Sequence, residues 1–228
     1  MTPENYCQRN SYQNNCRANN YNRNNSCTAN YAPPNCCAKN CSKMKRINVN
    51  QILMRTPDAV ANIRGSSEYP GISGKTGFYQ TEEGVLVVTE VWGLPQADDN
   101  RNNCNKYAKC CKRDCDNVNK CNSTVYGYHI HSGNRCQGNN EDAFSDAKAH
   151  YNPDDCQHPY HAGDMPPLFG NNGYAYMSFL TNRFCIREII GKTVIIHLEP
   201  DDFHTQPSGA SGTKIACGVI ESEKYTKK

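Results

Sequence analysis

Long apolar runs are missing from this sequence of 228 residues. No stretch approaches the roughly 20 consecutive apolar residues that span a bilayer, which excludes a transmembrane helix. The N-terminus has no apolar core of the kind found in secretory signals, so we expect no such signal. A large excess of one charge is also missing, since the formal net charge is only +3. Bulk electrostatic attraction to nucleic acid or to a membrane surface is therefore not predicted.

Aliphatic residues are nearly absent from residues 1–41, which carry twelve asparagines and six cysteines, with tyrosines at positions 6, 12, 21 and 31. Such a segment cannot bury enough apolar surface to offset the entropy lost on ordering. We predict a disordered tail that can be cross-linked, followed by a linker, so that residues 1–57 form the first segment.

Cysteine is abundant, with fifteen in the chain. Besides the six in the tail, five lie between Cys104 and Cys121, inside a polar stretch at 95–123 that interrupts the pattern around it. That stretch lacks both CxxC and histidine, which disfavours a zinc knuckle. Disulfides within or between chains are the favoured interpretation, and a solvated loop with spare thiols stays open. Disulfides indicate an oxidising compartment, although no secretory signal leads there.

From Asp58 the composition changes to short runs rich in β-branched and aromatic residues. The ranges 59–65, 74–80, 85–93, 173–180 and 215–220 read as strands, as does a run ending at His197. Residues near 183–191 read as a tight turn or a short edge segment. Without a long amphipathic helix, this pattern predicts an all-β domain over 58–221, a sandwich or barrel of antiparallel strands, with a polar C-terminal tail at 222–228.

Histidine is concentrated. Of seven histidines, five fall within residues 126–168, and one more ends a predicted strand. The candidate ligands are His129, His131, His150, His158, His161, Asp164 and His197. Residues two apart on a strand face the same side, so His129 and His131 can hold one ion together. The packing of a β domain has no use for six imidazoles, which favours a metal site over scattered surface histidines.

The sequence resembles the Cu/Zn superoxide dismutase family. The matching stretches are GISGKTGFYQ (71–80), VLVVTEVWGL (85–94), GYHIHSGNRC (127–136), AHYNP (149–153), HAGD (161–164), IIGKTVIIHLEPDD (189–202) and GTKIACGVI (212–220). The resemblance is to bacterial, Gram-positive-like members, and it implies an immunoglobulin-like Greek-key β-sandwich or barrel with long loops.

The resemblance also assigns the ligands. Copper would be held by His129, His131, His150 and His197, and zinc by His150, His158, His161 and Asp164. His150 would bridge the two ions and take part in catalysis. Asp201 would link ligands of both metals through hydrogen bonds, and Cys136 and Cys217 would form a disulfide.

Two features depart from the family pattern, one residue and one spacing. Lys214 stands where an arginine commonly lies near the copper; its ammonium can attract a small anion but lacks the guanidinium fork. His158 and His161 are closer in sequence than the corresponding ligands usually are, which makes zinc less secure than copper. His204 has no assigned role and is expected to face solvent.

The function implied by the resemblance is dismutation of superoxide to dioxygen and hydrogen peroxide. A structural coat protein cross-linked by disulfides, or a copper/zinc store using thiolates, are the alternatives. The expected partners are superoxide and, through disulfides, the chain itself or neighbouring coat proteins; a homodimer stays open. The tail is similar to proteins assembled into bacterial spore coats, so the alternatives for location are spore coat or cell surface, and otherwise the cytoplasm.

Overall fold

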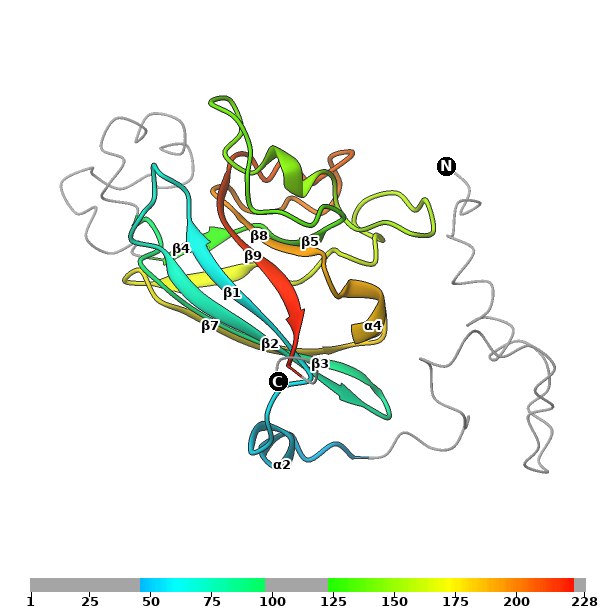
Figure 1. Ribbon diagram of the computed structural model, residues 1–228. Coiled ribbons are helices and arrows are strands. Elements are labelled where there is room, and N and C mark those ends of the chain that lie inside the picture. The colour runs from blue at the N-terminus through cyan, green and yellow to red at the C-terminus, as the bar shows by residue number, and fades with distance from the viewer. Residues whose placement is uncertain (1–45, 97–122, 224–228) are drawn as a thin grey trace, which may run out of the picture.

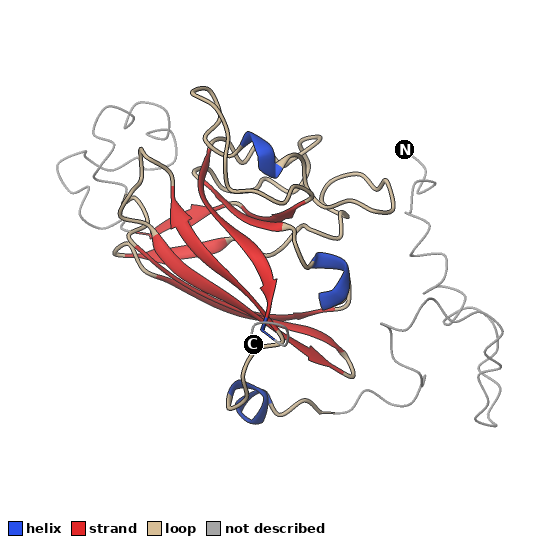
Figure 2. Cartoon of the chain, in the orientation of Figure 1, coloured by secondary structure: helices blue, strands red, loops and turns tan. Residues whose placement is uncertain are grey.

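One antiparallel sheet of seven strands forms the centre of the computed structural model, which describes residues 46–96 and 123–223. The strand order is β5-β8-β9-β1-β2-β3-β7, and a two-stranded sheet pairs β4 with β6. The strand bounds are β1 Ala59–Gly65, β2 Ser73–Thr81, β3 Gly84–Trp92, β4 Ser123–Tyr126, β5 Tyr128–His131, β6 Leu168–Asn171, β7 Ala175–Thr181, β8 Thr193–His197 and β9 Lys214–Ser222. The large sheet curls into a half-barrel (Figures 1 and 2).

The connections give the fold its topology. Strands β1, β2 and β3 follow one another both in the chain and in the sheet. Strand β7 lies at one edge, whereas β8, next in the chain, lies near the other edge between β5 and β9. The chain therefore crosses from one side of the barrel to the other, as Greek-key connections do. The predicted class, an all-β antiparallel Greek-key sandwich or barrel, is confirmed.

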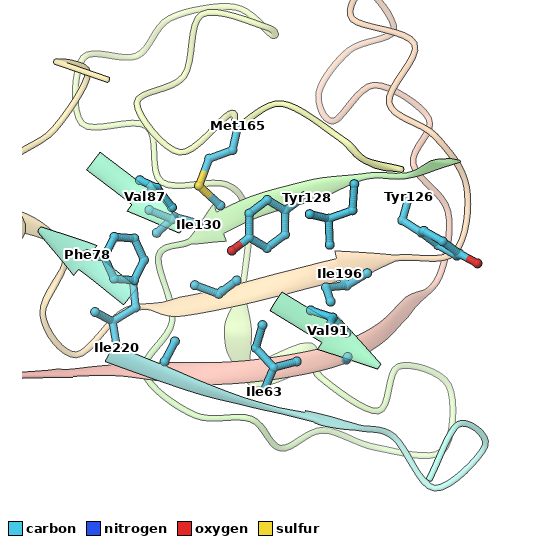
Figure 3. Packing of buried hydrophobic residues seen from close by; sticks show 14 of the residues in the cluster. Ile63, Phe78, Val87, Val91, Tyr126, Tyr128, Ile130, Met165, Ile196 and Ile220 are labelled. Atoms are coloured by element: carbon cyan, nitrogen blue, oxygen red, sulfur yellow. The ribbon is translucent and has the colours of Figure 1, made fainter. Parts of the chain in front are cut away.

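Alternation along the strands creates the core. The predicted strand 85–93 is β3, in which the side chains of Val85, Val87, Thr89 and Val91 share one face, and all four are fully buried. Figure 3 shows Val87 near Phe78 on β2 and Ile130 on β5, and Val91 near Ile196 on β8, within one cluster.

Strand β5 is fixed in the core by Tyr128. Its hydroxyl lies 2.7 Å from Thr76 Oγ1 and 2.8 Å from Thr89 Oγ1, and burial raises the pKa of Tyr128 to about 12. A buried hydroxyl needs such partners, so β5 has one favourable orientation with Tyr128 and Ile130 inward. Successive residues on a strand face opposite sides, and His129 and His131 therefore point away from the core.

Three local elements differ from the expectations. Residues expected to form a turn or edge segment contain the short helix α4, Ile186–Ile189, where the Cys185 N–H donates to Glu188 Oε2 at 2.8 Å while Ile186 and Ile189 are buried. The expected linker contains the helix α2, Val49–Leu53, started by the Asn48 side chain. The pairing of β4 with β6 was not predicted, because neither four-residue strand has a distinctive pattern.

The tail 1–41 and most of the stretch 95–123 lie outside the described residues, as do residues 224–228, so the predictions of disorder, cross-linking and segment boundaries stay predictions. Among the helices of the described ranges, none has the length and apolarity required to cross a membrane.

Candidate metal centre

Strands β5 and β8 bring three histidines to one face. In their antiparallel register His129 is opposite Ile195 and His131 is opposite Thr193. Directly paired residues share a face, so His197, two residues beyond Ile195, lies on the same face as both histidines. A register shift follows Ile196, which pairs with Ala216, so that His197 pairs with Lys214 and Ile215 is the extra residue on β9.

The loop of residues 150–164 runs along the other edge of β5. The Tyr151 N–H donates to Ile130 O at 2.8 Å, the Ile130 N–H donates to Gly163 O at 2.9 Å, and the Gly163 N–H donates to Tyr151 O at 2.8 Å. A Cβ at Gly163 would lie 2.2 Å from Ile130 O, so the close approach needs glycine. Isolated bridges pair His129 with Asp164 and His131 with His150. The loop ligands are thereby brought against the strand ligands.

The result is two groups of buried ligand atoms, each set lying within 4.8 Å of one another. The four-histidine group consists of His129, His131, His150 and His197, and the mixed group of His150, His158, His161 and Asp164. Both groups contain His150. All the histidines and the aspartate predicted as ligands are thus brought together, and the short interval between His158 and His161 does not keep their rings apart, with centroids at 5.5 Å.

Fixed acceptors orient the rings of the four-histidine group. His131 Nδ1–H donates to Lys148 O at 2.6 Å, and His197 Nδ1–H donates to Gly212 O at 3.1 Å. Because a carbonyl can only accept, the proton of each ring is held at Nδ1 and the lone pair is left on Nε2. The two Nε2 atoms face each other at 3.2 Å.

Asp201 connects the two groups. Its Oδ2 accepts from His129 Nε2 at 2.8 Å, and its Oδ1 accepts from His158 Nε2 at 2.9 Å. The sequence prediction for Asp201 describes the same link. One carboxylate therefore fixes the tautomer of a ring in each group and leaves Nδ1 of both rings available.

Burial keeps three members of the four-histidine group, His131, His150 and His197, neutral. It lowers the pKa of His197 to about 3 and that of His150 to about 4, with the neighbouring His129 ring acting in the same direction. The pKa of His131 falls well below its usual value for the same reasons, burial first and then the rings of His150 and His197. Neutral imidazoles offer lone pairs to a metal.

Asp164 supplies negative charge in the mixed group. Burial alone would raise the pKa of its carboxyl, but hydrogen bonds from His150 and His161 outweigh burial and bring it far below the usual range. Asp164 Oδ1 lies 2.8 Å from His150 Nδ1, and Oδ2 lies 3.1 Å from His158 Nδ1 and 3.3 Å from His161 Nδ1. This carboxylate faces all three imidazoles of its group.

Copper and zinc fit these residues. His129 Nδ1, His150 Nε2 and His158 Nδ1 are buried without a well-aligned hydrogen-bond partner among the described residues. A buried polar atom left in this state is costly, and coordination of a cation would satisfy each of them. Four imidazoles suit copper, whereas three imidazoles with one carboxylate suit zinc. The two donor sets match the copper and zinc that the resemblance implies.

A disulfide attaches the neighbouring loop. Cys136 and Cys217 are bonded, with their Cα atoms 5.5 Å apart, as the resemblance predicts. The bond connects the loop after β5 to β9 and packs with Phe144, Ala147 and Ile195 on the outer face of the sheet. It thereby anchors the segment that carries Lys148 O, the acceptor of His131.

Lys214 lies beside the four-histidine group but does not stand alone. It is paired in register with His197, and its ammonium lies 2.5 Å from Asp142 Oδ2 and 3.4 Å from Phe144 O. Sequence reasoning gives Lys214 no acidic partner, because Asp142 is 72 residues away in the chain. The side chains are 15% and 37% exposed respectively, so solvent reaches the pair and the charge of Lys214 is partly offset.

Other supporting residues were not predicted either. Gln206 binds the backbone of His158 through both the N–H, at 3.0 Å, and the carbonyl, at 2.8 Å, and Arg183 binds carbonyls of the 150–164 loop. No motif marks these residues in the sequence. His204, in contrast, has a side chain 79% exposed, and it faces solvent as expected.

Comparisons with known proteins agree with the site. The family model for copper/zinc superoxide dismutase matches residues 116–220. A Cu-Zn superoxide dismutase of Legionella pneumophila is 29% identical over 172 residues, covering 72% of this chain and 87% of that protein. Superoxide dismutase 2, a Cu-Zn enzyme by name, from Aquifex aeolicus is 27% identical over 164 residues, covering 65% and 79%.

The fold has a solved counterpart. The crystal structure of a double mutant of a superoxide-dismutase-like protein from Bacillus subtilis superposes with a TM-score of 0.51 at 22% identity, covering 72% of this chain and 97% of that one. At this identity the likeness concerns the fold alone. The family match, the named relatives and the two ligand groups together support the copper/zinc superoxide dismutase family for this chain.

Proposed function

We propose that this chain catalyses the dismutation of superoxide, with copper in the four-histidine group and zinc in the mixed group. The observation that carries the proposal is the pair of buried ligand groups that share His150. A protein that used this fold only as a scaffold would have no need for seven buried ligands with oriented rings. In the reaction, two superoxide anions and two protons give one dioxygen and one hydrogen peroxide.

When bound, copper supplies a one-electron couple that alternately accepts and returns an electron, and zinc supplies a fixed positive charge without redox chemistry. The chain's own residues supply the rest. Lys214 attracts the anion toward the four-histidine group, with a strength reduced by Asp142. His150, whose Nδ1 faces the mixed group and whose Nε2 faces the four-histidine group, is the residue whose Nε2 can hold a proton for the peroxide product.

Ring orientation is the contribution of the surrounding carbonyls and of Asp201. Because they fix which nitrogen of each ring carries the proton, the remaining nitrogens converge without rearrangement. Preorganisation of this kind lets the site change charge by one electron with little movement of its ligands.

Metal analysis of the purified full chain, combined with a superoxide dismutation assay, tests the proposal. We expect one copper and one zinc per chain, activity that disappears on metal removal, and activity that returns when both metals are restored. His129→Ala should lose copper and activity while remaining folded. Full activity of a His129→Ala protein would overturn the assignment, and binding of many more than two ions per chain would favour a metal store.

A further inference from the structure

Arg183 lies between β7 and α4 and directs its guanidinium at the 150–164 loop. Its Nη1 is 3.0 Å from Pro159 O, 3.1 Å from Asp164 O and 3.2 Å from His161 O. Three backbone carbonyls therefore converge on one cationic nitrogen. Hydrogen bonds from a charged donor are about twice as strong as those between neutral groups.

The carbonyls that Arg183 binds belong to the residues that carry the mixed group. Two are those of the ligands His161 and Asp164, and the third follows the ligand His158. Carbonyl dipoles pointing to a common centre repel one another, so this turn of the loop needs a cation there. The guanidinium meets that need with donors held in a rigid plane.

The two ends of this turn are held by other means. Gln206 fixes the backbone of His158, and Met165, directly after Asp164, is buried in the core, where Figure 3 shows it directed toward Ile130. Between these two points the turn from His161 to Asp164 is closed by its own hydrogen bonds and by Arg183.

We propose that Arg183 is a positioning residue for zinc: it sets the relative placement of His161 and Asp164, and with it the affinity of the mixed group. The inference rests on the proposed function in assigning zinc to that group. Its effect is confined to one metal, because His129, His131 and His197 are held by strands β5 and β8, which Arg183 does not touch through any of these bonds.

Zinc affinity of the full chain, measured by competition with a chromophoric chelator, tests the proposal without turnover. Arg183→Gln removes the charge and should weaken zinc binding about 10- to 100-fold, the usual range for residues that orient ligands. Copper affinity should change less than about twofold. Arg183→Lys keeps the charge and three N–H donors, so it should restore a large part of the zinc affinity.

Two further measurements separate positioning from general stability. Co²⁺ bound in place of zinc has a visible absorption spectrum that reports ligand geometry, and Arg183→Gln should alter it. The matched control Arg187→Gln removes the same charge from α4, four residues further along, and should leave both the zinc affinity and the Co²⁺ spectrum unchanged.

The inference is overturned if Arg183→Gln keeps zinc affinity within twofold of the unaltered chain, if copper and zinc affinities fall together, or if Arg183→Lys is no better than Arg183→Gln. Failure of the proposed function looks different. An unaltered chain that binds copper and zinc but does not dismutate superoxide overturns that function and leaves the role of Arg183 intact. An unaltered chain that binds no zinc overturns both.

Discussion

The two metal-ligand groups share His150 and yet are built by opposite means. Three ligands of the four-histidine group lie on paired strands, where a ladder of backbone hydrogen bonds fixes their spacing. Three ligands of the mixed group lie within seven residues of one loop, where side chains such as Gln206 and Arg183 replace the ladder. The geometry of a site on paired strands is fixed by the backbone hydrogen bonds of the fold. The geometry of a site on a loop depends instead on contacts that individual side chains provide.

The difference has a chemical side as well. All ligands of the four-histidine group are imidazoles, whereas the mixed group adds the carboxylate of Asp164, whose pKa lies far below its usual range. Under the proposed assignment, the cation that changes charge during turnover would be surrounded by imidazoles alone, while the cation of constant charge would be paired with an anion. We expect perturbations of the two groups to be separable except at His150 and Asp201, which belong to both sides.

Removal of a strand-borne ligand should have the largest effect. His197→Ala should reduce dismutation at least about 100-fold and abolish copper binding, because four imidazoles suit copper and three leave the site incomplete. Zinc should be retained, since His197 is not in the mixed group. Metal content by elemental analysis and the rate of dismutation measure both effects. His204→Ala removes an exposed histidine and serves as the control. Loss of zinc together with copper would show that the groups are not separable.

A substitution at Asp201 should disturb both ligand groups at once. In Asp201→Asn the amide offers one acceptor where the carboxylate offers two, so the rings of His129 and His158 cannot both keep their orientation. Affinities for copper and for zinc should each fall about 10- to 100-fold. Chelator competition for the two metals measures this, with Asp202→Asn as the neighbouring control. If only one affinity changes, Asp201 does not connect the groups in solution.

The ion pair of Lys214 and Asp142 tests how charge beside the four-histidine group affects the rate of dismutation. Lys214→Gln should slow dismutation and Asp142→Asn should accelerate it, each by about fivefold, the factor given by roughly 1 kcal/mol between charges 4 Å apart in water. Both effects should shrink as salt screens the charges. The double variant should lie between the two single variants. Rates that respond to neither substitution would show that the pair does not influence the approach of superoxide.

The smallest effect concerns the stability of the metal-free protein in mild acid. The pKa of His197, about 3, and that of His150, about 4, lie below the value of roughly 6.5 expected in the unfolded chain. The unfolded chain therefore binds more protons over this interval, so stability is full above pH 6.5 and declines as the pH falls toward 4 and then 3.

Asp164 should add a separate stage on the side of the mixed group. Its lowered pKa means that its contribution is present above about pH 4, the ordinary value for an aspartate, and is lost only at lower pH. Denaturant midpoints of the metal-free chain at successive pH values would resolve the two stages. A midpoint that does not change between pH 7 and pH 4 would contradict the account of the buried histidines.

The fold class could be predicted from the sequence alone, and so could the candidate ligands that the structure brings together in two groups. Alternating runs such as Val85–Val91 predict strands because the side-chain period of a strand is fixed by its backbone. The pair His129 and His131 predicts a shared face for the same reason. Motifs around these residues carried the resemblance, and through it the link made by Asp201 and the disulfide of Cys136 with Cys217.

The residues that support those candidate ligands could not be predicted from the sequence. Asp142 reaches Lys214 and Arg183 reaches the 150–164 loop across long stretches of chain, and a contact of this kind leaves no periodic or motif signal. The helix α4 depends on Ile186 and Ile189 finding the core, which four residues cannot reveal on their own. The alternation of side chains along a strand can be predicted from neighbouring residues. The partner of a side chain, in contrast, is fixed only when distant segments pack together.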